Sequence, residues 1–288
     1  MDVSYLFVPA HKLNSARSLC LQNVDMIVID LEDSVHPQTK KEARESILNF
    51  DFSSIGSPQL KFGIRINKLN TLCGINDIKM MEELYNKNNL CFRHVFIPKL
   101  KNQNELELYI ELLRSIDPQV KFISIIETID SINNIEAIAN ISDALILGQA
   151  DLCSEMFQPN KAFIQYARAR VCIAAAKKNI PAIDTNSFEL QDLHKLEKEC
   201  LEAYEEGFLG KAVIHPCQAE TVQNIFSIRN DTMEKYSRWI DSYAHSSEGF
   251  FIDNGEIVAP PFVAKARKML DFYNKYGADS CRKPNNEF

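Results

Sequence analysis

The chain has 288 residues, of which 45% are hydrophobic, and this length is enough to bury one large core. Its net charge is −7, and basic residues are interspersed among acidic ones, which excludes the basic stripe that nucleic-acid binders use to attract phosphates. No run of about 18 apolar residues occurs, and the N-terminal MDVSYLFVPAHKLNS lacks the pattern of a secretory leader. We therefore expect a cytoplasmic protein without nucleic acid or membrane among its partners.

Eight short apolar runs rich in β-branched residues recur along the chain, each about as long as a buried parallel strand. Segments with helical periodicity separate these runs, and such alternation is typical of βαβ units. The nine glycines form no G-x-G-x-x-G motif and no phosphate-binding loop, which counts against a doubly wound dinucleotide-binding sheet. We therefore predict an α/β fold in which the strands close into a (β/α)8 TIM barrel. The predicted strands are 5–8, 26–31, 62–66, 94–98, 122–126, 144–148, 181–184 and 212–215.

The spacing of apolar residues predicts outer helices over 75–88, 105–116 and 163–178. After the eighth strand it predicts helices over 218–227 and 231–244, then a loop holding EGFFIDNGEIVAPP, and a last helix near 261–275. We expect the barrel to occupy residues 1–230 and residues 231–288 to form a C-terminal helical extension that packs on the barrel or a neighbouring subunit. Trp239, with Tyr236 and Tyr243, suits packing in a core.

The eight cysteines are scattered and include no C-x-x-C pair. This spacing matches neither a zinc site nor a disulfide framework, and several of the cysteines lie in apolar segments. We expect reduced thiols.

In a barrel of this kind the active site lies at the C-terminal ends of the strands. Ionisable side chains leave seven of the eight predicted strands at this end. Arg65 and Glu127 are notable because each adjoins a long apolar run, where an unpaired charge would be costly and needs partners or a metal. The residues at these ends are Asp30, Glu32, Asp33, Arg65, Asn67, Lys99, Glu127, Asp151, Asp184 and His215.

Glu127 and Asp151 leave consecutive strands, so their carboxylates should be neighbours on the rim, where they could hold one hard cation. Two carboxylates, several waters and an oxygen-rich substrate commonly hold magnesium, a Lewis acid that draws charge off a carbonyl as an enolate forms. Arg65 could orient a substrate carboxylate or stabilise the enolate oxygen. The structural alternative is a buried ion network of both acids with Arg65.

Glu32 and Asp33 belong to a run of acids at the end of the second strand. Their mutual repulsion could raise the pKa of one of them to a value suited to acid–base catalysis. Holding metal-bound waters is an equally good role for them. His215, which precedes Pro216, could simply close the eighth strand as a structural residue.

With these residues the chain resembles the citrate lyase beta-subunit-like branch of the HpcH/HpaI aldolase family over nearly its whole length. The resemblance implies a (β/α)8 barrel, assembled as a homotrimer or hexamer, that uses magnesium to cleave or form hydroxyacyl thioesters such as citryl, citramalyl or malyl compounds. The matching motifs, in the family's order, are YLFVPA (5–10), VIDLEDSV (28–35), IRINKLNT (64–71), VFIPK (95–99), IIET (125–128), LGQADL (147–152), ARARV (167–171) and GFLGKAVIHPCQ (207–218).

The resemblance also assigns roles to residues of this chain. Glu127 and Asp151 become metal ligands and Arg65 the substrate clamp, while Glu32 and Asp33 hold metal-bound waters. A coenzyme A carrier would lie near Lys211, His215 and Gln218, with Lys12 left to meet a phosphate. We also place Lys99, which directly follows the fourth predicted strand, in the substrate-binding set.

Two departures from the family pattern bear on the chemistry. The family usually has Gly-Ala-Glu-Asp where this chain has Gly148-Gln149-Ala150-Asp151, so one acid is missing while the ligand remains. Ala259 replaces a tail aspartate that, in many lyases of this group, reaches a neighbour's active site as an acid–base group. A methyl group cannot transfer a proton. Glu256 or Asp253 could substitute, the reaction could need no such group, or catalysis could be lost.

Three hypotheses therefore follow. The leading one is a magnesium-dependent carbon–carbon lyase acting on a short 3-hydroxyacyl thioester. The second is an aldolase that uses free 2-oxo acids such as pyruvate or oxaloacetate through the same enolate chemistry. The third is a non-catalytic ligand-binding homologue that kept the pocket.

Overall fold

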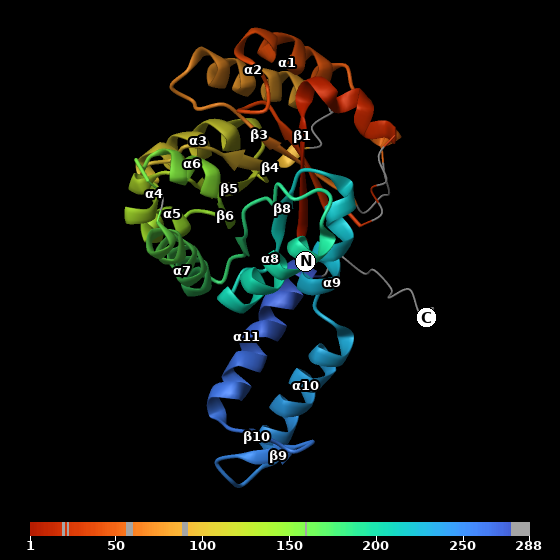
Figure 1. Cartoon of the computed structure of the whole chain (residues 1–288), viewed down its shortest axis with the longest axis vertical. Coiled ribbons are helices and arrows are strands. Elements are labelled where there is room, and N and C mark those ends of the chain that lie inside the picture. Colours follow the sequence, from red (N-terminus) through yellow and green to blue (C-terminus); the bar gives the residue numbers. More distant parts are fainter. Residues whose placement is uncertain (19–20, 22, 56–59, 88–91, 159, 278–288) are drawn as a thin grey trace. The chain divides into compact units, whose positions relative to one another are not determined.

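The computed structural model describes residues 1–18, 21, 23–55, 60–87, 92–158 and 160–277. The chain divides into two compact units, of which one spans Val3–Phe226 and the other joins Met1–Asp2 to the chain from Ser227 onward. The first unit is an α/β barrel, and the second consists of helices and a small hairpin (Figure 1).

Within the described residues, eight parallel strands form the barrel wall in the order β7-β6-β5-β4-β3-β2-β1-β8. Backbone hydrogen bonds close the ring, because the amide of Asp184 donates to the carbonyl of Gly210 at 2.8 Å and the amide of Ala212 donates to the carbonyl of Asp184 at 3.0 Å. The predicted (β/α)8 fold and its eight strands are confirmed. The strands are β1 (Ser4–Pro9), β2 (Met26–Asp30), β3 (Lys61–Arg65), β4 (Phe92–Ile97), β5 (Lys121–Ile126), β6 (Ala144–Leu147), β7 (Ala182–Ile183) and β8 (Lys211–Val213).

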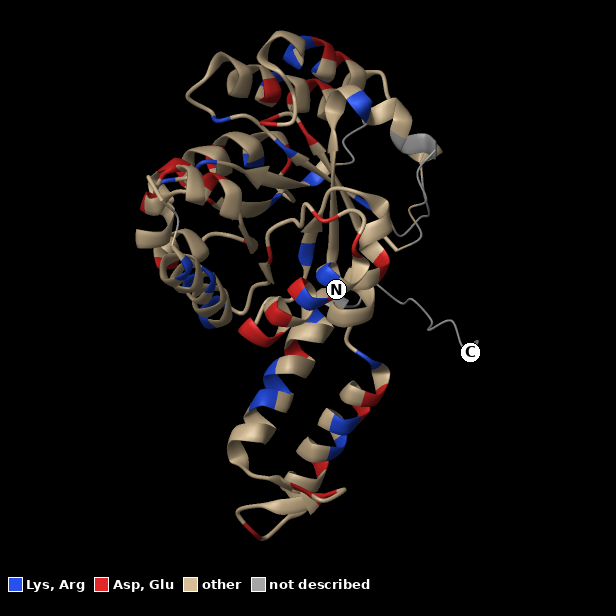
Figure 2. Ribbon diagram, viewed as in Figure 1, with Lys and Arg blue, Asp and Glu red and all other residues tan. Residues whose placement is uncertain are grey.

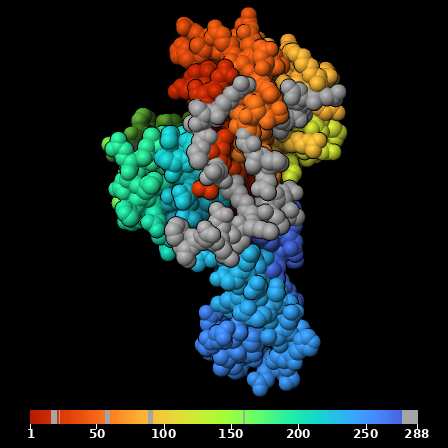
Figure 3. All heavy atoms as spheres, turned by 90° about the vertical axis from the view of Figure 1, so that its right-hand side faces the viewer, coloured from red at the N-terminus to blue at the C-terminus, as the bar shows by residue number. Residues whose placement is uncertain are grey.

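Helices surround this wall, and their basic and acidic residues are interspersed (Figure 2). In the space-filling view α8 and α9 lie against each other on the surface (Figure 3). The helices are α1 (Lys40–Leu48), α2 (Leu72–Asn86), α3 (Gln103–Ile116), α4 (Ile129–Asn133), α5 (Ile135–Ala139), α6 (Gln149–Ser154), α7 (Lys161–Lys178), α8 (Leu193–Glu206) and α9 (Ala219–Phe226), with short 3-10 turns η1 (Ala10–Ser18), η2 (Pro37–Thr39), η3 (Phe52–Ser54) and η4 (Pro216–Gln218).

The helices predicted over 75–88, 105–116 and 163–178 correspond to α2, α3 and α7, although position 88 lies outside the described residues. Each begins two or three residues earlier than its apolar pattern. The reason is a polar N-cap, since the side chains of Thr71, Asn102 and Asn160 each accept a hydrogen bond from a backbone amide in the first turn.

Apolar side chains from the strands fill the interior of the barrel and form its core. Gly63 makes room for one of them, because a Cβ atom at this position would lie 2.8 Å from the ring of Phe96. The cluster comprises Tyr5, Met26, Val28, Phe96, Ile123, Ile125, Ala144, Ile146, Ile183 and Ala212, with Phe7 packed against it.

The described cysteines are unpaired, as expected, and comprise Cys73, Cys153, Cys172, Cys200 and Cys217. Burial raises the pKa of the Cys200 thiol to about 12, which makes it an inert interior group. Cys20, Cys91 and Cys281 lie outside the described residues.

The second unit contains α10 (Asn230–His245), β9 (Phe251–Asp253), β10 (Glu256–Val258) and α11 (Pro260–Gly277). Trp239 is buried in its core with Val258, Val263 and Ala266, which is the packing role expected for this residue. No helix of the described residues is long and apolar enough to cross a membrane.

The segment predicted as a loop contains an antiparallel hairpin, so that prediction was wrong for β9 and β10. Asn254 and Gly255 form its two-residue turn and have φ angles of 50° and 86°. Positive φ at both positions is the requirement of a type I′ turn, for which Asn-Gly is the preferred sequence. The dipeptide was visible in the sequence, but its short flanking strands lack a clean alternation of apolar and polar residues.

Candidate active site

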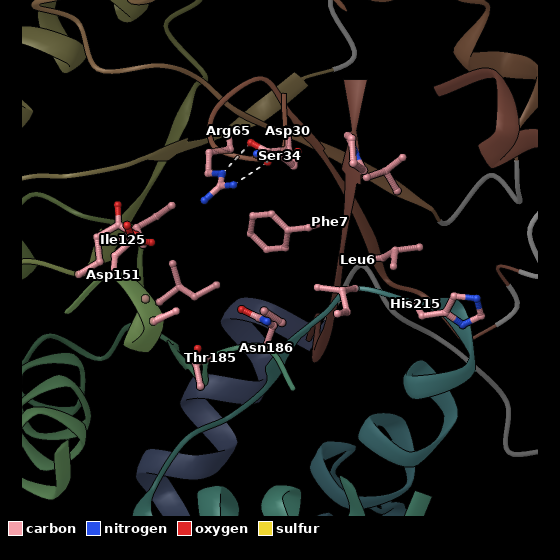
Figure 4. A pocket seen from close by; sticks show the side chains of 18 of the residues that line it. Leu6, Phe7, Asp30, Ser34, Arg65, Ile125, Asp151, Thr185, Asn186 and His215 are labelled. Atoms are coloured by element: carbon pink, nitrogen blue, oxygen red, sulfur yellow. Dashed lines mark hydrogen bonds and ion pairs between the residues drawn. The ribbon is translucent and has the colours of Figure 1, made fainter. Parts of the chain in front are cut away.

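A cavity of about 470 Å³ lies at the C-terminal end of the barrel strands (Figure 4). Arg65, Glu127, Asp151, Lys12 and His215, all predicted from the sequence, line it. In Figure 4, Arg65 and Asp151 lie on one side of Phe7 and His215 lies on the other. The remaining lining is largely apolar and includes Leu6, Phe7, Val8, Ile125, Ile146, Leu147, Ala212 and Ile214.

Arg65, the last residue of β3, is fixed by the neighbouring strand. Its guanidinium donates to both carboxylate oxygens of Asp30, at 2.7 and 2.5 Å, and lies 3.2 Å from a carboxylate oxygen of Glu32. The guanidinium carbon also lies 5.5 Å from the centre of the Phe7 ring, within the range of a cation–π contact. These contacts hold the planar group rigidly at the edge of the cavity.

Four carboxylates, those of Glu32, Asp33, Glu127 and Asp151, surround Lys99 and form what we call the carboxylate cluster. The Lys99 Nζ atom lies 2.5 Å from Asp151, 2.9 Å from Asp33 and 3.5 Å from Glu32. The backbone amide of Lys99 donates to Oε1 of Glu127 at 2.7 Å. The structure thus brings together the predicted metal ligands, the predicted water-holding acids and Lys99.

The crowding of negative charge alters the titration of the cluster. Burial raises the pKa of Glu127 to about 8, and the adjacent Asp151 carboxylate adds to this effect. Burial also raises the pKa of Glu32 to about 7, although the charge of Arg65 opposes it. Burial alone would lower the pKa of Lys99, but its hydrogen bonds to Asp151 and Asp33 more than offset this and raise it. A bound proton or a further cation would therefore stabilise the carboxylate cluster.

The residues present fit a hard divalent cation such as magnesium. Glu127 and Asp151 offer oxygen donors only, and the cluster already binds one cation, the Lys99 ammonium. Among the described residues no group of three His, Cys, Asp or Glu side chains has the arrangement of a metal site. The protein would therefore supply two carboxylates, with water and substrate oxygens completing the coordination.

Gly148 provides the space that Glu127 occupies. A Cβ atom at position 148 would lie 2.5 Å from the Glu127 Cβ and 2.6 Å from its Oε2. We expect Gly148→Ala to destabilise the protein by about 1–3 kcal/mol through overpacking and to weaken magnesium binding by displacing Glu127. Urea unfolding and calorimetric titration with magnesium test this. Gly249→Ala is the matched control, because a Cβ atom there meets nothing within 4 Å; equal behaviour of the two variants would contradict the expectation.

Two residues predicted to lie near a carrier are placed away from the cavity lining. Lys211 is only 2% exposed and its Nζ lies 2.5 Å from Asp184, which also pairs with Arg168 at 2.7 Å. Lys211 begins β8 opposite Ser4, the first residue of β1, so it stands at the other end of the strand from the cavity. Asp184 neutralises the buried charge of the Lys211 ammonium, which is therefore not available to bind a phosphate of the carrier.

Gln218 is fully buried and acts in the local structure. Its side-chain oxygen accepts hydrogen bonds from the amides of Ile214 and His215, and its nitrogen donates to the carbonyls of Ser187 and Glu189. These bonds fix the loops that follow β7 and β8. Gln218 therefore supports the cavity wall without lining it.

Several lining residues were missed or given no role in the sequence analysis. Asp30, which orients Arg65, was recognised only as a strand end, while Ser34, Thr185 and Asn186 were not singled out. Their positions were detectable, since Thr185 and Asn186 directly follow the seventh predicted strand. Small polar residues are so common in loops that position alone does not distinguish them.

The acids considered as substitutes for the missing tail aspartate have partners within the second unit. Asp253 accepts a hydrogen bond from the Trp239 indole at 2.8 Å, and Glu256 pairs with Lys235 at 2.7 Å. Ala259 precedes α11, where its carbonyl accepts a hydrogen bond from the amide of Phe262 at 2.9 Å. These contacts give Asp253 and Glu256 structural roles.

Residues 3–216 match the HpcH/HpaI aldolase/citrate lyase family. The chain is 27% identical over 290 residues to "Citrate lyase subunit beta" of Leuconostoc mesenteroides subsp. cremoris, covering 93% of this chain and 92% of that protein. It is 25% identical over 278 residues to "(3S)-malyl-CoA thioesterase" of Cereibacter sphaeroides (strain ATCC 17025 / ATH 2.4.3), covering 93% of each. The structure of CitE from Mycobacterium tuberculosis in complex with magnesium, acetoacetate and coenzyme A has a TM-score of 0.73 and 21% identity, covering 95% of this chain and 98% of that one. The chain therefore belongs to the HpcH/HpaI aldolase/citrate lyase family of lyase-type enzymes.

Proposed function

We propose that this protein is a magnesium-dependent carbon–carbon lyase that cleaves or forms a short 3-hydroxyacyl thioester such as citryl-, citramalyl- or malyl-coenzyme A. The observation that carries the proposal is the convergence of Arg65, Glu127 and Asp151 on one cavity at the C-terminal ends of the barrel strands. One fixed cation and two carboxylates suit an enolate reaction, in which negative charge develops on an oxygen beside a bound metal.

Each residue has a defined task in this proposal. Glu127 and Asp151 hold the magnesium ion, which when bound supplies a Lewis acid for the substrate carbonyl. Arg65, locked by Asp30, orients a substrate carboxylate and stabilises the oxygen on which charge develops. Glu32, whose pKa burial raises to about 7, is suited to hold or move a proton. Asp33 holds metal-bound water.

The main support for a coenzyme A thioester as substrate comes from proteins that are similar to this chain. Proteins named citrate lyase subunit beta and malyl-CoA thioesterase are similar to this chain, and the CitE structure contains magnesium and coenzyme A. Lys12 and His215 line the cavity and are the proposed contacts for the carrier. We extend the proposal to a cytoplasmic homo-oligomer, a trimer or hexamer.

The experiment is an activity assay with magnesium on purified protein. Malyl-, citramalyl- and citryl-coenzyme A are supplied in turn and the products are separated chromatographically. We expect acetyl-coenzyme A together with the corresponding 2-oxo acid from one of them, with no product from Asp151→Asn. Free coenzyme A with the intact hydroxy acid would instead indicate thioester hydrolysis, the activity in the name of the Cereibacter relative. Tight binding of all three thioesters without turnover would favour the non-catalytic alternative.

Burial of Lys211 favours a second candidate, an aldolase acting on free 2-oxo acids. Lys211 is paired to Asp184, and Lys12 is the one lysine among the described residues that line the cavity. Little positive charge is therefore left to bind a polyphosphate carrier. The enolate chemistry would be unchanged. If pyruvate or oxaloacetate with magnesium raises the melting temperature while acetyl-coenzyme A leaves it unchanged, the aldolase replaces the lyase as the better description.

A further inference from the structure

Lys99 contacts both proposed metal ligands at once. Its backbone amide donates to Glu127 at 2.7 Å, and its side-chain ammonium lies 2.5 Å from Asp151. Its φ angle of 54° lies in the left-handed region, which residues with a Cβ atom rarely adopt. The hydrogen bond to Glu127 holds this strained backbone in place and so fixes the position of Lys99 in the loop that follows β4.

The ammonium uses its donors on the carboxylate cluster. Nζ donates hydrogen bonds to Asp151 at 2.5 Å and to Asp33 at 2.9 Å, and it forms a longer ion pair with Glu32 at 3.5 Å. The Lys99 side chain is 30% exposed and that of Asp151 is 33% exposed. Solvent therefore reaches their ion pair, and the Lys99 side chain has room to move outward. Among the described residues, Lys99 is not part of the cavity lining, but its ammonium contacts the lining residue Asp151.

We propose that Lys99 is a tethered counter-cation that competes with the divalent metal for Asp151 and must leave this carboxylate before the metal binds. The inference rests on the proposed function for the identity of the site. Two cations cannot share one carboxylate oxygen at bonding distance without strong like-charge repulsion. Lys99 therefore stabilises the metal-free cluster and lowers its affinity for magnesium, which makes it a positioning residue that sets when the metal binds.

The test is calorimetric titration of the full chain with magnesium chloride in the absence of substrate. We expect Lys99→Gln to bind magnesium about tenfold more tightly than the wild type. Lys12→Gln is the matched control, because Lys12 carries the same charge and lines the cavity without an ion pair to Asp151 in the described residues. Solvent screens its more remote charge, so its effect should stay below about twofold.

Each outcome distinguishes the inference from the function on which it rests. Unchanged or weaker magnesium binding by Lys99→Gln, or equal tightening by both variants, overturns the competition while leaving the metal site intact. Absence of binding in the wild type and in Lys99→Gln contradicts the proposed function as well. If Lys99→Gln binds magnesium and the wild type does not, the inference is supported, because Lys99 then excludes the metal completely.

A second measurement on the wild type keeps the inference testable if Lys99→Gln does not fold. The protein is acetylated briefly with and without magnesium, and modification of individual lysines is followed by peptide mass spectrometry. Magnesium should increase the labelling of Lys99 about threefold or more, since a displaced ammonium loses its ion pairs, while exposed Lys41 should not change. Equal labelling of Lys99 in both conditions would overturn the inference.

Discussion

Replacing either proposed metal ligand, as Glu127→Gln or Asp151→Asn, should abolish the stabilisation that magnesium gives to the protein. Each change removes one of two negatively charged donors while keeping the side-chain shape. For a wild-type protein with magnesium at about one hundred times its Kd, the gain in stability is about 2.7 kcal/mol, which corresponds to a rise in Tm of about 5 °C or more. Differential scanning calorimetry with and without magnesium measures this directly.

The control for this prediction is Asp130→Asn. Asp130 lies three residues after Glu127, but its side chain is 56% exposed and pairs with Lys101 on the surface. It should keep the full magnesium shift, as the wild type does. A ligand variant that retained the shift and folded normally would show that the metal site is elsewhere.

Arg65→Met should destabilise the protein by about 3–5 kcal/mol, because it leaves the buried Asp30 carboxylate without its charged partner. Asp30 is 1% exposed and accepts two hydrogen bonds from Arg65. Urea unfolding followed by circular dichroism provides the free energy. Arg93→Met is the matched control on the adjacent strand, since its side chain is 57% exposed and its ion pair with Asp117 is longer, at 3.6 Å. If Arg65→Met lowered the free energy of unfolding no more than Arg93→Met does, the prediction would be contradicted.

The ion pair of Arg65 with Asp30 also determines how the destabilisation by Arg65→Met depends on pH. Burial alone would raise the pKa of Asp30, but the charge and hydrogen bonds of Arg65 hold it below the ordinary value of 3.8. In the wild type this contribution to stability is complete above that value and is lost as the pH falls through the lowered pKa. Without Arg65, burial raises the pKa, so the variant loses stability as the pH rises. The difference between the two proteins should therefore be larger at about pH 7 than at about pH 4.

Together these results would distinguish a metal site from the structural alternative of a buried ion network. In such a network Arg65, Glu127 and Asp151 would all contribute to stability. In the structure Arg65 is instead satisfied mainly by Asp30, while Asp151 pairs with Lys99. The two predictions should therefore separate, with Arg65→Met affecting folding and Asp151→Asn affecting metal binding.

The sequence by itself determined the barrel and the edge of the barrel on which the proposed site lies. Eight apolar runs alternating with helical segments define parallel strands, and all parallel strands end on the same side. Arg65 ends one such run, Glu127 directly follows another, and Asp151 lies three residues after a third, so their arrival at one rim followed from chain order. N-terminal helix boundaries were less accurate, because the capping residues precede the apolar pattern.

Only the tertiary structure decided which partner each charged side chain reaches. Lys211 and Lys99 both adjoin predicted strands, yet Lys211 lies at the start of β8 and is buried against Asp184, while Lys99 follows β4 and joins the carboxylate cluster. The difference depends on strand register and on residues distant in sequence. A long flexible side chain has several carboxylates within reach, and the packing of the whole barrel determines which of them it contacts.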